Sequence, residues 1–293
     1  MGFTVFLIGL LYVVFISLLI AVGVQSITVI VIAAVLLFSQ YYFSDKIALY
    51  SMGARIVTSE QAPELHAIVD RLVAMANMPK PQVAIADIDM PNAFATGRSP
   101  KAAVVCATTG LLRRLDSQET EAVLAHELSH VAHKDVAVMT IASFLGMVAG
   151  FLTRIALWSG MFMGGGNSRG NNNSNNNAAA IELAVVLVSA IIYAISFLLT
   201  RALSRYRELS ADRSGAILIG RPSMLASALV KVSGEMGRIP TRDLRSASAF
   251  NAFYFAPALT QGMSLGNLVS THPTLERRLE QLSKLEEQMN RPS

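Results

Sequence analysis

The chain has 293 residues, of which 53% are hydrophobic and 15% are charged, and its formal net charge is +4. Soluble domains have about 25% charged residues, so this composition indicates a membrane protein rather than a soluble enzyme. The basic residues form no dense run with aromatic residues beside it, which argues against nucleic-acid binding. The only cysteine, Cys106, lies in the apolar run AAVVCAT and is expected to be a buried strand residue. Any metal ion must therefore be held by histidines and carboxylates.

The chain begins with two uncharged apolar stretches, residues 4–23 and 27–43. Each is close to the roughly 20 residues that a helix needs to cross a bilayer, and the linker VQS allows only a tight turn. The first stretch lacks a basic start and is followed at once by the second. We therefore expect it to be retained, as half of a transmembrane hairpin, rather than cleaved as a signal peptide.

The polar region after this hairpin predicts a helix, a small sheet and a second helix. The first helix is expected within residues 58–77, with Thr58 and Gln61 at capping-box spacing. Asp116 and Glu119 have the spacing of a helix start, so the second helix is expected to begin there. Between the helices, short apolar runs punctuated by proline and glycine predict three strands. These runs are QVAIADI (82–88), NAFATG (92–97) and AAVVCATTG (102–110).

The second helix, expected over residues 117–134, contains the sequence HELSH. Positions four apart share one face of a helix, so His126 and His130 can reach the same metal ion, and Glu127 can approach a water bound to it. This H-E-x-x-H arrangement is typical of zinc peptidases. Zinc suits imidazole ligands and lowers the pKa of its water toward about 7, and the glutamate takes the proton. We predict one zinc ion per chain.

Two further apolar stretches, roughly residues 136–158 and 180–200, predict a second transmembrane hairpin. The Gly/Asn-rich loop 164–177 between them has no means of forming a core, and we expect a mobile loop outside the membrane. Arg154 and Glu182 lie near the ends of these stretches, on the same side of the hairpin. Snorkelling to the interface or a mutual ion pair accounts for both charges.

Basic residues are concentrated on one side of the four stretches. Cytoplasmic loops carry the excess of lysine and arginine, so both polar regions, 44–135 and 201–293, are expected to be cytoplasmic. The absence of disulfides agrees with a reducing compartment. The basic residues on this side include Lys46, Arg55, Lys134, Arg201, Arg205 and Arg207, whereas the opposite loops have Arg169 alone.

A catalytic zinc ion needs a third protein ligand, and two residues compete for that role. His133 lies on nearly the same helix face as His126 but about 10 Å further along the axis, which makes a shared ion difficult. Glu208 in RELSAD is the better candidate. Asp212, four residues later, could accept a hydrogen bond from a ligand histidine. Spacing alone leaves open a solvated carboxylate pair that balances the neighbouring arginines.

HELSH in a helix, ELSAD just after a membrane hairpin, and paired N-terminal spans resemble the HtpX family of bacterial membrane zinc metalloproteases. These are relatives of the CAAX prenyl protease and of the mitochondrial Oma-type protease. The resemblance covers nearly the whole chain. It implies that the zinc ligands are His126, His130 and Glu208. It also implies that Glu127 is the catalytic base and that Asp212 contacts a ligand histidine.

The resemblance further implies contacts with the substrate. NAFATG matches the family's edge strand, on which Asn92 and Ala93 hold the substrate backbone by strand addition. STHP, at 270–273, resembles a family motif near the active site and makes His272 a candidate transition-state or loop contact. The implied activity is endoproteolysis of misfolded or damaged membrane proteins during envelope stress. The implied location is the bacterial inner membrane, with the catalytic face in the cytoplasm.

The expected fold is a mostly helical α+β membrane protein with about four transmembrane helices in two hairpins. A zincin-like cytoplasmic catalytic domain contains the small sheet, and a helix expected to begin at Pro273 ends the chain. We expect hairpins at 1–43 and 136–200. The region between the hairpins, residues 44–135, is expected to carry the HExxH helix. The region after the second hairpin, residues 201–293, is expected to carry the third ligand.

Two other functions are alternatives to an endopeptidase. A catalytically silent membrane scaffold could use zinc structurally, but such a site has no use for the base Glu127. A transporter would place polar or charged residues in the middle of its spans, whereas the charged residues of these spans, Arg154 and Glu182, lie near the ends. The expected partners are membrane-protein substrates and the lipid bilayer, with no nucleic acid, and the oligomeric state stays open.

Overall fold

The computed structural model describes residues 48–97, 99–135, 137–144, 172–236 and 270–291, together with residues 10, 35, 38, 42, 43, 46, 146, 148–150 and 255. The spans expected at 4–23 and 27–43 lie almost entirely outside the described residues, as does most of the loop 164–177. The chain divides into two compact units. One comprises residues 1–40 and 139–203, and the other comprises residues 41–138 and 204–293.

A four-stranded mixed sheet forms the β part of the second unit, with strand order β1-β2-β4-β3. β2 and β4 are parallel, while β1 pairs with β2 and β3 pairs with β4 in antiparallel fashion. All three predicted strands are present as β2, β3 and β4. Because β3 comes last in the strand order, it is an edge strand. β1 was not predicted because three residues are too few to show alternation. The strands are β1 (Ala54–Ile56), β2 (Gln82–Ala86), β3 (Ala93–Thr96) and β4 (Val104–Thr108).

Helix α5 (Ser117–Ala132) begins as predicted. The Asp116 side chain accepts hydrogen bonds from the backbone N–H groups of Gln118 and Glu119, and the Glu119 side chain returns to the backbone of Asp116. This reciprocal capping box satisfies donors that a helix start would otherwise leave unpaired. The other helices of this unit are α3 (Pro63–Ala76), α4 (Thr109–Arg114), α8 (Pro222–Met236) and α11 (Leu275–Met289), with the end of α7.

Two helix starts differ from the sequence-based expectation. Gln61 does accept a hydrogen bond from the Thr58 N–H, but α3 begins only at Pro63, whose fixed φ suits a first helical position. Pro273 was wrongly expected to be the first residue of the last helix. Thr274 caps α11 instead, because its side chain accepts the N–H of Arg277.

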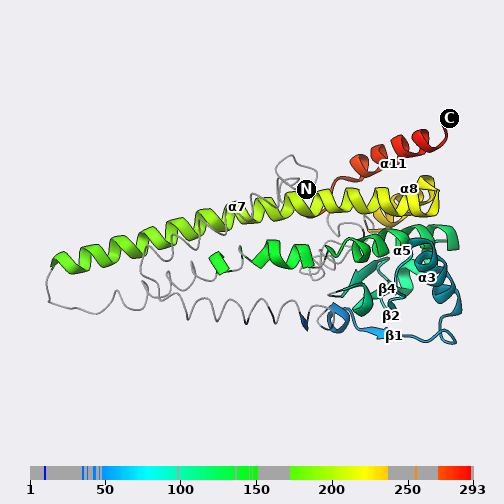
Figure 1. The fold of residues 1–293 in the computed structure, drawn as a ribbon, viewed down its shortest axis with the longest axis horizontal. Helices are drawn as coiled ribbons and strands as arrows, with labels where there is room; N and C mark the ends of the chain where they lie inside the picture. The colour runs from blue at the N-terminus through cyan, green and yellow to red at the C-terminus, as the bar shows by residue number, and fades with distance from the viewer. Residues whose placement is uncertain are drawn as a thin grey trace. The chain divides into compact units, whose positions relative to one another are not determined.

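The hydrophobic core of this unit lies between the sheet and the helices. α5 packs against β3, α3 and α8, and α8 packs against α11 (Figure 1). Fully or almost fully buried members of this core include Leu72, Val105, Leu124, Leu229 and Leu282. Cys106 is buried in β4 as expected, and burial raises the pKa of its thiol to about 12. Helix α5, which carries the HELSH motif, is packed into this core.

Helix α7 (Asn172–Ile219) is continuous and already includes residues 172–177, which were expected in the loop. Among the described residues it supplies the one helix long and apolar enough to cross a membrane, at Val186–Ile219. A second results only if Ser117–Ala132 and Ala137–Gly150 count as one broken span. Within the first unit, Gly146 of the helical segment Ala137–Gly150 lies close to Ser196 of α7. A Cβ atom added to Gly146 would lie 3.1 Å from Ser196 Oγ, so this segment and α7 approach closely.

Candidate metal centre

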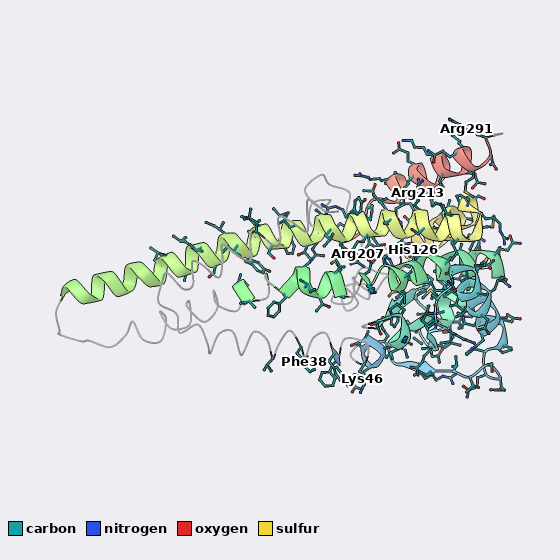
Figure 2. The ribbon with its side chains drawn as sticks, in the orientation of Figure 1. Phe38, Lys46, His126, Arg207, Arg213 and Arg291 are labelled. Atoms are coloured by element: carbon teal, nitrogen blue, oxygen red, sulfur yellow. The ribbon has the colours of Figure 1, made fainter. Side chains whose placement is uncertain are left out.

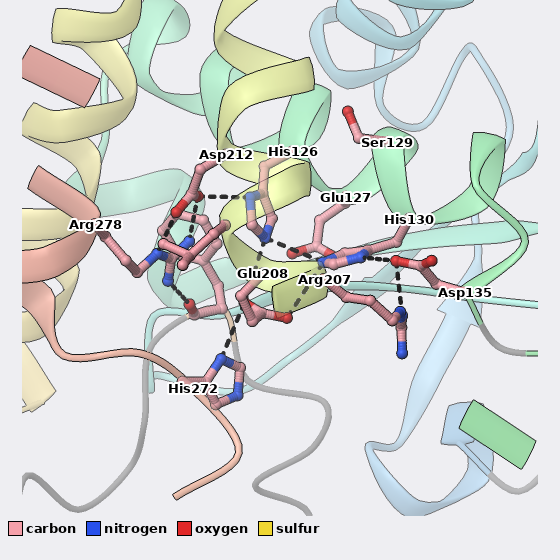
Figure 3. Close-up of polar contacts among 12 residues, drawn as sticks. His126, Glu127, Ser129, His130, Asp135, Arg207, Glu208, Asp212, His272 and Arg278 are labelled. Carbon is pink, nitrogen blue, oxygen red and sulfur yellow. Dashed lines mark hydrogen bonds and ion pairs between the residues drawn. The ribbon is translucent and has the colours of Figure 1, made fainter. Parts of the chain in front are cut away.

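His126 and His130 extend from the same face of α5, one turn apart. Their Nε2 atoms lie 3.2 Å from each other and their ring planes are 89° apart. Each Nδ1 atom lies beside a carboxylate, that of Asp212 for His126 and that of Asp135 for His130. Both Nε2 atoms are therefore available to one common ligand (Figure 3). Figure 2 labels His126 and Arg207 within the chain.

Glu208 approaches the histidine pair from α7. Its Oε1 atom lies 3.4 Å from His130 Nε2, and its Oε2 atom lies 3.7 Å from His126 Nε2. The two helices can approach this closely because Gly215 faces the backbone of α5. A Cβ atom added to Gly215 would lie 2.8 Å from the backbone nitrogen of His126.

The three donor groups fit a zinc ion. In a tetrahedral zinc site with bonds of about 2.0–2.1 Å, two ligand atoms are about 3.3 Å apart. The 3.2 Å between the two Nε2 atoms agrees with that value. One Glu208 oxygen lies 3.4 Å from His130 Nε2 and the other lies 3.7 Å from His126 Nε2, and one ligand atom from each of the three residues lies within 4.8 Å of the others. Two imidazoles and one carboxylate also leave a fourth position for water or substrate, as in catalytic zinc sites.

Asp212 lies on α7 one turn beyond Glu208 and is fully buried. Its Oδ1 atom is 2.9 Å from His126 Nδ1, although the two groups are not aligned for a linear hydrogen bond. Arg278 of α11 donates hydrogen bonds of 2.7 and 2.6 Å to the two oxygens of Asp212. The buried carboxylate is therefore compensated by a bidentate guanidinium. The sequence analysis assigned Asp212 but missed Arg278.

A second carboxylate, Asp135, was also missed. Its Oδ2 atom accepts hydrogen-bond contacts from His130 Nδ1 at 2.6 Å and from Arg207 Nη2 at 2.7 Å. Burial raises the pKa of Asp135, but the hydrogen bonds from His130 and Arg207 outweigh it, so the pKa lies below the usual range. Asp135 follows the end of the helix, where helical spacing gives no guide to its position.

Glu127 lies on α5 next to His126 and is 6% exposed. Its Oε2 atom accepts a hydrogen bond of 3.0 Å from the backbone N–H of Ala95 in β3. Burial raises the pKa of its carboxyl group. A raised pKa brings a carboxylate closer to the operating pH, where proton acceptance is most efficient. Glu127 therefore has the environment of a general base and lies outside the ligand group.

Asn92 and Ala93, at the start of the edge strand, are both buried. The Oδ1 atom of Asn92 accepts a hydrogen bond of 2.9 Å from the backbone N–H of Phe255. The carbonyl of Phe255 accepts one of 2.8 Å from Arg278, and its ring packs against His126 with the centroids 5.2 Å apart. Phe255 thus connects Asn92 to His126, and nothing in the sequence indicated this.

The two remaining histidines of the sequence analysis have different surroundings. His272 is buried, and its Nδ1 atom lies 3.0 Å from Glu208 Oε2, so it contacts the third donor group. His133 is exposed at the C-terminal end of α5 and does not belong to the group of possible metal ligands. The geometry therefore brings Glu208, and not His133, to the histidine pair.

Comparison with known proteins decides the family. The model of peptidase family M48 matches residues 59–286, a range that contains every group described above. The chain belongs to peptidase family M48. The resemblance to HtpX is also confirmed, because Protease HtpX homolog 1 of Streptomyces coelicolor is 58% identical over 97% of this chain and 91% of its own length. The Protease HtpX homolog of Moorella thermoacetica is 53% identical over 99% of this chain and 94% of its own length.

The fold of this M48 peptidase resembles that of a solved structure. The crystal structure of S. mikatae Ste24p superposes with a TM-score of 0.55 at 16% sequence identity, covering 94% of this chain. This chain spans 62% of the length of that larger protein. The family and the relatives establish a metalloprotease, and the apolar part of α7 agrees with a membrane protein.

Proposed function

We propose that the chain is an integral-membrane zinc endopeptidase that hydrolyses peptide bonds of misfolded or damaged membrane proteins. The observation that carries this proposal is the convergence of two histidines and one glutamate beside a second, buried glutamate that is not part of the group. A structural metal site has no need of a proton acceptor next to it, whereas a hydrolytic site does. Glu127 therefore favours hydrolysis over a silent zinc-binding scaffold.

The donor groups of His126, His130 and Glu208 would hold the zinc ion. When bound, zinc supplies a Lewis acid that lowers the pKa of water and polarises the scissile carbonyl. Glu127 accepts the proton of the attacking water and delivers it to the leaving amine. The hydrogen bond from the Ala95 N–H supports this role because it fixes the orientation of the carboxylate.

The substrate is proposed to add a strand beside β3. Among the described strands, β3 pairs only with β4, and it packs on α5, so a segment bound there would lie beside the site. Asn92 and Ala93 would hold the substrate backbone. Asn92 Oδ1 accepts the backbone N–H of Phe255 in the structure, so a substrate N–H would have to replace this bond. For His272, the contact with Glu208 favours a role in the loop that holds this ligand over a direct transition-state contact.

The proposed location is the bacterial inner membrane, with multiple spans and the catalytic face in the cytoplasm. The supports are the four apolar stretches of the sequence, the basic residues that flank them on one side, and the apolar part of α7. In this arrangement the chain would act in protein quality control during envelope stress, with residues 44–135 and 201–293 forming the catalytic part.

The deciding experiment compares wild type with Glu127→Gln. Both full-length proteins are purified in detergent with a chelator, supplied with zinc, and followed for bound metal and for cleavage of an unfolded test protein. We expect both to bind one zinc ion and only wild type to cleave. Cleavage by Glu127→Gln at the wild-type rate would refute the mechanism. Binding by both without cleavage by either would favour the scaffold.

A further inference from the structure

Each of the two histidines has its Nδ1 atom beside a buried carboxylate, and the two carboxylates belong to different parts of the chain. Asp212 lies on α7, in the motif that also contains Glu208. Asp135 lies beyond the end of α5. Its contact with His130 is the shorter of the two, at 2.6 Å against 2.9 Å, and it is the one aligned as a hydrogen bond. Asp135 is therefore placed to act on His130 directly.

The backbone after α5 is shaped to bring Asp135 to this position. α5 ends at Ala132, and Lys134 has a φ of 54°, in the left-handed region that residues other than glycine seldom adopt. The chain bends there, by 63° between Ser117–Ala132 and Ala137–Gly150, and Asp135, which is 2% exposed, lies against the ring of His130. Unusual backbone conformations persist where the surrounding structure determines them, and they concentrate at functional sites.

Arg207 connects Asp135 to the second helix of the site. Its Nη2 atom lies 2.7 Å from Asp135 Oδ2, the same oxygen that contacts His130, and its side chain is 11% exposed. Arg207 immediately precedes Glu208 in the sequence. The ion pair therefore joins the end of α5 to the turn of α7 that carries the third donor group (Figure 3). Because the pair is buried, removing one charge leaves the other uncompensated.

We propose that Asp135 and Arg207 are positioning residues for the metal ion. Asp135 accepts the Nδ1 proton of His130, which fixes the ring and turns the Nε2 lone pair toward the ion. Arg207 holds Asp135 in that position and ties α5 to α7 beside Glu208. The inference rests on the proposed zinc site and deepens it. Two of the three donor groups are thereby fixed by one ion pair.

The test measures zinc affinity rather than cleavage. Full-length wild type, Asp135→Asn, Arg207→Gln and the double variant are titrated in detergent against a chromophoric chelator. The zinc dissociation constant is expected to rise about 10- to 100-fold in Asp135→Asn and about 10-fold in Arg207→Gln. The double variant should lie within about twofold of Asp135→Asn, because Arg207 acts through Asp135. The visible spectrum of the cobalt-loaded protein should change in Asp135→Asn, because the orientation of His130 changes.

Glu121→Gln is the matched control. Glu121 lies on the same helix, its side chain is 6% exposed, and it pairs with Arg71 at 2.6 Å, outside the donor group. This variant should keep zinc affinity within about twofold of wild type, as expected for a site that shares no partner with the metal ligands. An equal loss in Glu121→Gln would assign the effect to general destabilisation and overturn the proposal.

The remaining outcomes are also decisive. Wild-type affinity in Asp135→Asn and Arg207→Gln would overturn the proposal. If Asp135→Asn fails to fold, the affinity of Arg207→Gln decides alone. A wild-type chain that binds no zinc would overturn both the zinc site and this inference. A wild-type chain that binds zinc but cleaves nothing would contradict the proposed function only.

Discussion

The Nε2 atoms of His126 and His130 lie 3.2 Å apart, a separation at which a single ion can be bonded to both. Helical spacing brings the two side chains to one face of α5, since the residues are four apart. Glu208 comes from a different helix, and its position depends on how closely α7 approaches α5. The donor group, the approach of the two helices and the surrounding network can therefore be altered separately by substitution.

The first prediction concerns the third ligand. Glu208→Ala should lower zinc affinity more than about 100-fold, because changes to residues that only contact a ligand already cost 10- to 100-fold. Zinc content after dialysis against a weak chelator measures the loss. His133→Ala is the control, since His133 is exposed, and it should retain wild-type zinc. The reverse result, full zinc in Glu208→Ala and loss in His133→Ala, would make His133 the ligand.

The second prediction concerns the approach of the two helices. Gly215→Ala should destabilise the protein by about 1–3 kcal/mol, as expected for overpacking against backbone, and should weaken zinc binding by moving α7. Gly234→Ala, on the exposed side of α8, meets no atom within 4 Å. It should instead be neutral or add about 0.5–1 kcal/mol, since alanine is the better helix former. Equal thermal unfolding temperatures for the two variants would contradict this account.

Arg278 provides the third prediction. Arg278→Met leaves the buried carboxylate of Asp212 without its partner, which should cost about 3–5 kcal/mol of unfolding free energy. The neighbouring Arg277 is exposed, and Arg277→Met should change stability by less than about 0.5 kcal/mol. Denaturant unfolding of both metal-free variants measures the difference. A small effect of Arg278→Met would mean that Asp212 finds compensation elsewhere.

The cap of α5 provides the fourth. Asp116→Ala removes two hydrogen bonds to the first turn of α5 and should cost about 1 kcal/mol of stability. Gln118→Ala, at an exposed position in the same turn, keeps the cap and serves as the reference. Both variants should bind zinc normally. A zinc defect in Asp116→Ala would show that the start of α5 influences the donor group.

Cys106 gives a prediction about pH. Burial raises the pKa of its thiol to about 12 in the folded chain. The unfolded chain, with an ordinary thiol, loses its proton at lower pH, so the protonated folded form contributes its full stability below pH ~8.5 and loses it as the pH rises toward ~12. A maleimide should not label Cys106 at pH 7 until the protein unfolds. Cys106→Ala should flatten the decline of stability at alkaline pH, and rapid labelling of the folded protein would refute the burial.

Local sequence rules predicted the parts of the site that depend on neighbouring residues. Helical periodicity and capping act within one or two turns. They therefore predicted that His126 and His130 share a face and that Asp116 and Glu119 cap the helix. Pro273 misled because proline is tolerated at the first helical position without requiring it, and the adjacent Thr274 offers a side-chain acceptor that proline lacks.

Contacts between distant segments were not readable from one sequence. Arg278 reaches Asp212 across 66 residues, and Phe255 reaches Asn92 across 163. Sequence separations this long do not follow the periodicity of a helix or a strand, so no local pattern predicts these contacts. Asp135 is near His130 in sequence, yet its position follows from the left-handed backbone of Lys134, a conformation for which lysine gives no signal. These residues surround the donor group, so the sequence indicated the candidate metal ligands but not the residues that contact them.

The hydrogen bond between Glu127 and the backbone N–H of Ala95 has a consequence for any chain that binds along β3. The carboxylate and the strand share one bond, so a shift of the strand along its own axis also shifts the proton acceptor relative to the two histidines. A segment that pairs with β3 in the wrong register would therefore misplace both its own backbone and the Glu127 carboxylate relative to the two histidines. Under the proposed strand addition, backbone register on β3 would set both where a peptide rests and how well it is cut.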